Sequence, residues 1–140
     1  MFVYLDTSSL VKLYVEEAES SQVDALVKTS KFTSTSLVAY AEARAAFARR
    51  FREGAFTPDE HDHIKKFFDK DWSRYLILSV TRELIRLAGD LAEKHALRGF
   101  DSIHLASALT LQRELASSVV FSCFDDTLKK ASEGENLDQG

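Results

Sequence analysis

The sequence has 140 residues, of which 45% are hydrophobic and 11% aromatic, enough for one domain with its own core. No apolar run approaches the length of a membrane span, no charged segment precedes the first apolar run as in a signal peptide, and the single cysteine excludes an internal disulfide. These features predict a cytoplasmic protein. The net charge of −4 argues mildly against a nucleic-acid binder, although a catalytic cluster of carboxylates would itself supply about that much negative charge.

Strand-like and helix-like patterns alternate along the chain. Apolar or β-prone runs predict strands at residues 2–6, 32–36, 75–80 and 119–124. Helices are expected near residues 11–15 and 23–27, over 37–52, from 57 onward, over 84–92 and over 101–115. The alternation predicts a three-layer α/β/α sandwich with a mainly parallel central sheet. Residues 1–133 are expected to form a single domain, and the polar stretch 134–140 a flexible tail.

Four acidic residues lie at positions where an α/β fold of this kind can place ligand-binding or catalytic side chains. Asp6 ends the first apolar run, Asp125 ends the last, Asp101 opens a predicted helix, and Glu42 lies inside an alanine-rich helix. The carboxyl ends of parallel strands meet at one edge of the sheet, where ligands bind. Carboxylates gathered there repel one another unless a cation lies between them, and oxygen ligands suit Mg²⁺ or Mn²⁺. The pattern is typical of a metal-dependent enzyme that cleaves phosphodiester bonds.

Each of these acids also has a purely structural interpretation. Aspartate is a favoured helix N-cap residue, and Asp6, Asp101 and Asp125 all lie at or near a predicted helix start. Glu42 lies within a helix, where capping does not apply and an exposed surface position is the ordinary outcome. The sequence alone leaves both interpretations open.

Histidines and arginines near the acids leave further alternatives. His104 follows Asp101 by three residues, so the two can share a helix face as a metal pair, although a packed, hydrogen-bonded histidine is the favoured interpretation. The segment Glu60-His61-Asp62-His63 is interpreted as a solvated helix face. Positive side chains could hold RNA phosphates or form an ordinary charged surface; the candidates are Arg44, Arg49 and Arg98, with Arg50 and Arg52 on the same helix as the first two.

Several stretches together resemble the PIN-domain ribonucleases, most of all the VapC-like toxins of type II toxin–antitoxin modules. The matching stretches are residues 3–11, Glu42, residues 97–106 and residues 121–125. The resemblance implies a PIN-like fold and an endoribonuclease that binds Mg²⁺ or Mn²⁺ through Asp6, Glu42, Asp101 and Asp125. It also implies that Ser8 bonds a carboxylate or a metal-bound water, while the neighbouring Asp126 could share the role of Asp125.

The resemblance further implies a cognate antitoxin partner and a homodimer or a toxin–antitoxin hetero-oligomer. Aromatic side chains could form the antitoxin groove or a dimer interface, or could equally be core; they are Phe47, Phe51, Phe67, Phe68 and Trp72. Two other functions stay open: a non-catalytic protein-binding module, and an RNA-processing nuclease outside a toxin–antitoxin system. A phosphatase of the haloacid dehalogenase type is disfavoured, because it needs a second aspartate where this chain has Ser8.

Overall fold

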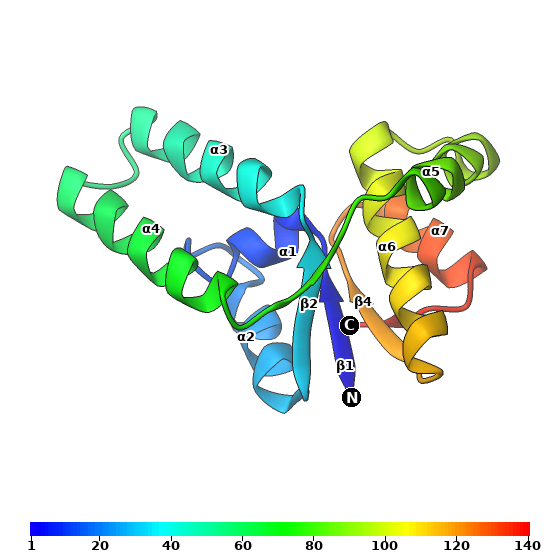
Figure 1. Cartoon of the computed structure of the whole chain (residues 1–140). Coiled ribbons are helices and arrows are strands. Elements are labelled where there is room, and N and C mark those ends of the chain that lie inside the picture. Colours follow the sequence, from blue (N-terminus) through cyan, green and yellow to red (C-terminus); the bar gives the residue numbers. More distant parts are fainter.

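A computed structural model describes all 140 residues as one parallel sheet with seven helices (Figure 1). The strands are β1 (Phe2–Leu5), β2 (Phe32–Ser36), β3 (Leu76–Leu78), β4 (Val119–Ser122) and β5 (Asp138–Gln139). The helices are α1 (Thr7–Val11), α2 (Ser20–Thr29), α3 (Ala39–Arg52), α4 (Pro58–Trp72), α5 (Arg82–His95), α6 (Gly99–Leu115) and α7 (Asp126–Gly134). All strand pairs are parallel, in the order β3-β2-β1-β4-β5. The predicted fold class is therefore confirmed.

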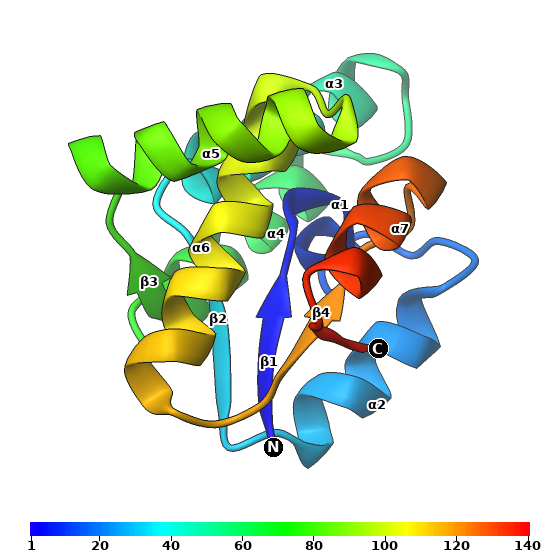
Figure 2. The ribbon, with the colours of Figure 1, turned by 90° about the vertical axis from the view of Figure 1, so that its right-hand side faces the viewer.

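The central strand β1 divides the core between two layers of helices. Val3 and Leu5 point to one face and pack with buried residues of α1 to α4, whereas Tyr4 points to the other face and packs with α5, α6 and α7. This alternation follows from the period-two geometry of a strand. Figures 1 and 2 show the two helical layers on either side of the sheet, with α3 and α4 extending away from it as a pair. None of the helices combines the length and apolarity needed to cross a membrane.

Local signals explain several helix ends. Thr57 and Glu60 form a reciprocal capping box at the start of α4, with Pro58 in its first turn, as the sequence predicts. Thr81 caps α5, whose predicted apolar face is confirmed by the burial of Leu84 and Leu91. Gly54 follows α3 with a φ of 84°, a backbone conformation that favours glycine.

Three expectations about the elements differ from the structure. The helix expected at 11–15 ends at Val11, and turns follow it. The run 75–80 is expected to be a strand, yet β3 spans only three residues at the edge of the sheet, where Leu76 is 40% exposed. The stretch 134–140 is not a free tail, because Leu137 is buried in the core and β5 pairs with β4. Leu137 is the only apolar side chain in this stretch, and its burial holds the stretch against the core although the other residues are polar or glycine.

The carboxylate of Glu135 links the ends of two helices near this C-terminal strand. Its Oε2 atom accepts hydrogen bonds from Lys94 Nζ at 2.7 Å and from His95 Nε2 at 2.6 Å. These bonds from Lys94 and His95 hold the pKa of Glu135 below its ordinary value. A carboxyl group with a lowered folded-state pKa adds stability above its unfolded pKa and loses it as the pH falls through the folded pKa.

Glu135→Gln should therefore lower the melting temperature at pH 7 and not at pH 3. We expect a loss of about 1–3 °C, because a pair near the surface contributes roughly 0.5–1 kcal/mol. Thermal unfolding of both chains at the two pH values measures the difference. An equal loss at pH 3 would mean that the side chain acts through packing and not through its charge.

Candidate active site

The acidic residues lie around the carboxyl ends of β1 and β4, where successive connections cover opposite faces of the sheet. Strands β1 and β4 lie side by side with Leu5 opposite Ser122, and the Asp6 amide donates to the Ser122 carbonyl at 3.1 Å. The connection after β1 covers one face of the sheet, while the connection that leads into β4 covers the other. Such a switch point opens a crevice at the carboxyl ends of the strands. Here it forms a pocket of about 430 Å³ lined by Asp6, Thr7, Ser8, Glu42, Arg98, Asp101, His104, Phe124 and Asp125.

Asp6 and Asp125 reach the pocket as helix N-caps. Asp6 Oδ1 accepts from the Ser9 amide at 2.9 Å and from the Ser8 hydroxyl at 2.8 Å. Asp125 Oδ2 accepts from the Leu128 amide at 3.0 Å at the start of α7. The capping interpretation is confirmed for these two residues, yet both also line the pocket. The structural and functional interpretations of the sequence are thus compatible.

Asp101 and Glu42 enter from inside helices. Asp101 lies in the first turn of α6, which begins at Gly99, so it is not the N-cap; its Oδ2 atom accepts from Arg98 Nε at 3.0 Å. Glu42 lies in the first turn of α3, where its Oε1 atom accepts from the Thr7 hydroxyl at 2.5 Å and lies 3.0 Å from His104 Nε2. The surface interpretation of Glu42 is wrong, because its side chain is half-buried and held from two sides.

All four carboxylates share one feature: one oxygen accepts hydrogen bonds from the protein, and the other oxygen has no protein partner. The oxygens without a protein partner are Oδ2 of Asp6, Oε2 of Glu42, Oδ1 of Asp101 and Oδ1 of Asp125. No fully buried side-chain oxygen in the chain lacks a partner, so these four free oxygens are accessible. They surround the pocket and do not meet at one point, since no three acidic, histidine or cysteine side chains lie close enough to hold one ion.

Burial makes the charge on Asp6 costly. Asp6 is 5% exposed, and this burial raises its pKa above the ordinary value; His104 and the hydrogen bonds from Ser9 and Ser8 offset the effect only in part. Burial also opposes ionisation of Glu42, but the hydrogen bonds from His104 and Thr7 outweigh it and lower the Glu42 pKa. The two carboxylates therefore differ: Glu42 is stabilised as an anion by the protein, and Asp6 much less so.

The other candidate residues divide between the pocket and the surface. Ser8 lines the pocket and donates to Asp6, as expected of a residue that bonds a carboxylate. Asp126 begins α7 outside the pocket, so Asp125 is the acid of this pair that lines it. The favoured interpretation of His104 is confirmed, since it is buried and hydrogen-bonded. In the segment Glu60-His61-Asp62-His63 three residues are exposed, as interpreted, whereas His61 is partly buried and stacks on Phe51 with ring centroids 4.5 Å apart.

Only one of the three candidate arginines lines the pocket. Arg98 does so, and its side chain is 81% exposed. The guanidinium of Arg44 donates to the hydroxyl of Tyr40, which in turn donates to Asp69. Arg49 lies on the exposed side of α3, 3.9 Å from Glu53.

Most of the five candidate aromatic residues pack in the core. Phe47 and Phe68 are fully buried, Phe51 and Trp72 are partly buried, and only Phe67 is largely exposed, at 60%. Sequence reasoning missed Thr7 and Tyr4, whose hydroxyls contact Glu42 and His104, respectively. Thr7 follows Asp6 directly and Tyr4 precedes it by two residues, so closeness to Asp6 in the sequence could have indicated that they lie near the pocket.

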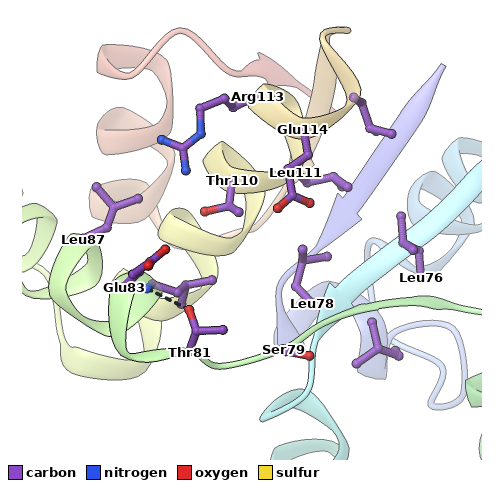
Figure 3. Close-up of a pocket in the computed structure, with 13 residues that line it drawn as sticks. Leu76, Leu78, Ser79, Thr81, Glu83, Leu87, Thr110, Leu111, Arg113 and Glu114 are labelled. Atoms are coloured by element: carbon purple, nitrogen blue, oxygen red, sulfur yellow. Dashed lines mark hydrogen bonds between the residues drawn. The ribbon is translucent and has the colours of Figure 1, made fainter.

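A larger cavity lies away from the acids. It measures about 700 Å³ and lies between the edge strand β3 and helices α5 and α6, lined by several leucines and by polar residues that include Glu83, Arg113 and Glu114 (Figure 3). None of the four candidate acids lines it, so the larger volume alone does not indicate the candidate site.

Asp6→Asn should stabilise the chain at pH 7 in the presence of a chelator. Asparagine keeps the cap and removes a charge whose burial raises the pKa of this group. A carboxyl group with a raised folded-state pKa loses stability as the pH rises from the unfolded value, about 3.9, through the folded one. We expect the variant to melt about 2–4 °C higher at pH 7, the shift that roughly 1 kcal/mol produces, and the gain to vanish near pH 3. A lower melting temperature at pH 7 would contradict this account of Asp6.

The chain is similar to known proteins over most of its length. The family model of the PIN domain matches residues 3–133. The chain is 38% identical to Ribonuclease VapC45 of Mycobacterium tuberculosis over 109 residues, which cover 78% of this chain and 76% of that protein. It shares its fold with the crystal structure of Mycobacterium tuberculosis VapC20, a sarcin-ricin loop cleaving toxin, with a TM-score of 0.67, 16% identity and coverage of 92% and 94% of the two chains. It is also similar to VapBC2 of Rickettsia felis bound to a DNA fragment from their promoter, with a TM-score of 0.63, 16% identity and coverage of 100% and 98%. The matched model spans the strands and helices that carry all four acids, and the chain therefore belongs to the PIN-domain family.

Proposed function

We propose that this protein is the endoribonuclease toxin of a toxin–antitoxin pair, and that it hydrolyses RNA phosphodiester bonds with Mg²⁺ or Mn²⁺. The observation that carries the proposal is the set of four carboxylates around one pocket, each with one oxygen fixed by the protein and one free. The similarity to VapC45, a protein named as a ribonuclease, supports the choice of RNA as substrate.

The free oxygens fit a hard divalent cation. Asp6, Glu42, Asp101 and Asp125 offer oxygen donors only, the set that Mg²⁺ and Mn²⁺ prefer. A cation bound there would lower the pKa of a bound water and neutralise charge on the phosphate. It would also offset the cost of burying ionised Asp6, whose pKa is raised by burial. Because the carboxylates surround the pocket without converging, a bound cation would contact some of them directly and complete its coordination with water.

The remaining residues of the pocket suit an RNA backbone. Arg98 is the one basic side chain in the lining, and its guanidinium is exposed enough to reach a phosphate. Ser8 donates to Asp6 and holds that carboxylate in place. A non-catalytic binding module would not need four carboxylates around one pocket that each leave one oxygen without a protein partner. The catalytic function is therefore favoured.

The proposal includes a cytoplasmic location and an antitoxin partner, with the chain assembled as a homodimer or with its antitoxin. A shallow pocket of about 390 Å³ beside α4 is one place for an apolar antitoxin segment; it is lined by Tyr14, Val15, Glu16, Phe56, Glu60, His63, Ile64 and Phe67. Phe67 is 60% exposed there and, with Phe56, Ile64 and Val15, offers apolar surface that such a segment could cover.

Asp101→Asn should reduce Mn²⁺-dependent cleavage of a mixed RNA pool by at least about 100-fold, because it removes a direct ligand. Asp126→Asn is the matched control: it removes the same charge in the next helix outside the pocket and should cleave at the wild-type rate. Gel analysis of cleavage with Mn²⁺, Mg²⁺ or chelator gives the comparison. Wild-type cleavage by folded Asp101→Asn would refute the proposed ligand set.

Arg98→Ala should weaken RNA binding and reduce its dependence on salt. Loss of one phosphate contact lowers the slope of log affinity against log salt by about 1 and affects all RNA sequences alike. Arg49→Ala is the control, because Arg49 is an exposed arginine outside the pocket. The Michaelis constant measured at several salt concentrations tests both variants, and equal salt slopes for Arg98→Ala and wild type would exclude Arg98 as a phosphate contact.

A further inference from the structure

The most heavily engaged side chain at the pocket is a histidine. His104 is 2% exposed, and both of its ring nitrogens have partners. Nδ1 lies 2.8 Å from the Tyr4 hydroxyl, while Nε2 lies 3.0 Å from Glu42 Oε1 and 3.1 Å from the Thr7 hydroxyl. The ring also packs edge-on against the Tyr4 ring, with centroids 5.8 Å apart. Thr7 of α1 and His104 of α6 thus contact Glu42 of α3 directly, and Tyr4 of β1 contacts His104 behind them.

The partners determine where the ring carries a proton. An ionised carboxylate only accepts hydrogen bonds, so Nε2 must be protonated to bond Glu42. A ring protonated on Nδ1 alone would place two acceptors 3.0 Å apart, which is unfavourable. Since the Thr7 hydroxyl also donates to Oε1 at 2.5 Å, two donors hold the same oxygen of Glu42.

This arrangement argues against His104 as a metal ligand. A coordinating nitrogen must offer its lone pair to the ion. A protonated Nε2 has no free lone pair, and Nδ1 faces Tyr4 in the core. The histidine therefore acts on the site through Glu42.

We propose that Tyr4, Thr7 and His104 are positioning residues that fix Glu42 Oε1 and so leave Oε2 as the single oxygen offered to a divalent cation. This inference rests on the proposed metal-dependent function. Partners of this kind, hydrogen-bonded to a metal ligand, typically change metal affinity or activity by about 10–100-fold when they are removed.

Two substitutions of His104 by amide side chains distinguish a role in positioning Glu42 from a role in core packing. In His104→Gln the amide lies at the level of Nε2 and can still donate to Glu42. In His104→Asn it lies at the level of Nδ1 and reaches only Tyr4. We expect His104→Asn to weaken Mn²⁺ binding, measured by electron paramagnetic resonance, about 10–100-fold, and His104→Gln to stay within a few-fold of wild type. Cleavage rates should follow the same order.

The Thr7 hydroxyl gives a second pair that does not depend on the buried histidine. Thr7→Ser keeps the donor, and Thr7→Val keeps the shape but removes it. We expect Mn²⁺ affinity to fall for the valine variant and to be retained by the serine variant. These variants decide the question if the His104 variants do not fold. Equal Mn²⁺ affinity in Thr7→Val and wild type, or in folded His104→Asn and wild type, would overturn the positioning role. An equal loss in His104→Gln and His104→Asn would overturn it as well.

One measurement is independent of metal and of activity. A long-range ¹H–¹⁵N spectrum of the wild-type chain in chelator reports which ring nitrogen of His104 is protonated. We expect a proton on Nε2, and a ring protonated on Nδ1 alone would overturn the inference. A chain that has the Nε2 proton but neither binds Mn²⁺ nor cleaves RNA would refute the proposed function instead, so the two failures can be distinguished.

Discussion

The parallel pairing of β1 with β4 is the constraint on which the site depends. With Leu5 opposite Ser122, the next residues of both strands leave the sheet at the same edge. Asp6 follows directly, and Asp125 follows after two residues, each as the cap of a new helix. A shift of one residue in this register would reverse the faces of Val3, Tyr4 and Leu5 and exchange the two halves of the core. The core packing that secures the register therefore also places two of the four acids.

Hydrogen bonds then divide each carboxylate into a fixed and a free oxygen. For Asp6 and Asp125 the fixed oxygen accepts from a backbone amide at a helix start, so each side chain caps a helix and still leaves its other oxygen at the pocket. For Glu42 the fixed oxygen is held by Thr7 and His104, and for Asp101 by Arg98. Burial raises the pKa of Asp6, so the protein alone opposes the ionised form of this carboxyl group. The divalent cation that we propose would favour the ionised form.

Much of this arrangement could be predicted from the sequence, because it follows from local patterns. The period-two strand around Tyr4, the capping box at Thr57 and the apolar stripe of α5 all depend on residues close in sequence. Asp6 and Asp125 were identifiable because they follow strands, whereas Glu42 and Asp101 lie in helices and were selected with the help of the family resemblance. The two interpretations of Asp6 and Asp125 could not be separated in the sequence, because both residues cap a helix and also line the pocket, so the structural interpretation does not exclude the functional one.

The features that sequence reasoning missed depend on contacts between distant segments. The order of strands in the sheet leaves β3 at its edge, which the apolar run 75–80 does not reveal. The last residues look like a solvated tail until Leu137 enters the core beside α7. His104 is 62 residues from Glu42 along the chain, so only the fold brings the two side chains together.

The most direct test of the account is the position of a bound ion. Crystals of the wild-type chain grown with saturating Mn²⁺ would show it by anomalous scattering. The account predicts a peak in the pocket bounded by Asp6, Glu42, Asp101 and Asp125, in contact with oxygens that are free in the present structure. No peak in that pocket, or an ion held elsewhere such as beside Glu60 and His63, would contradict it.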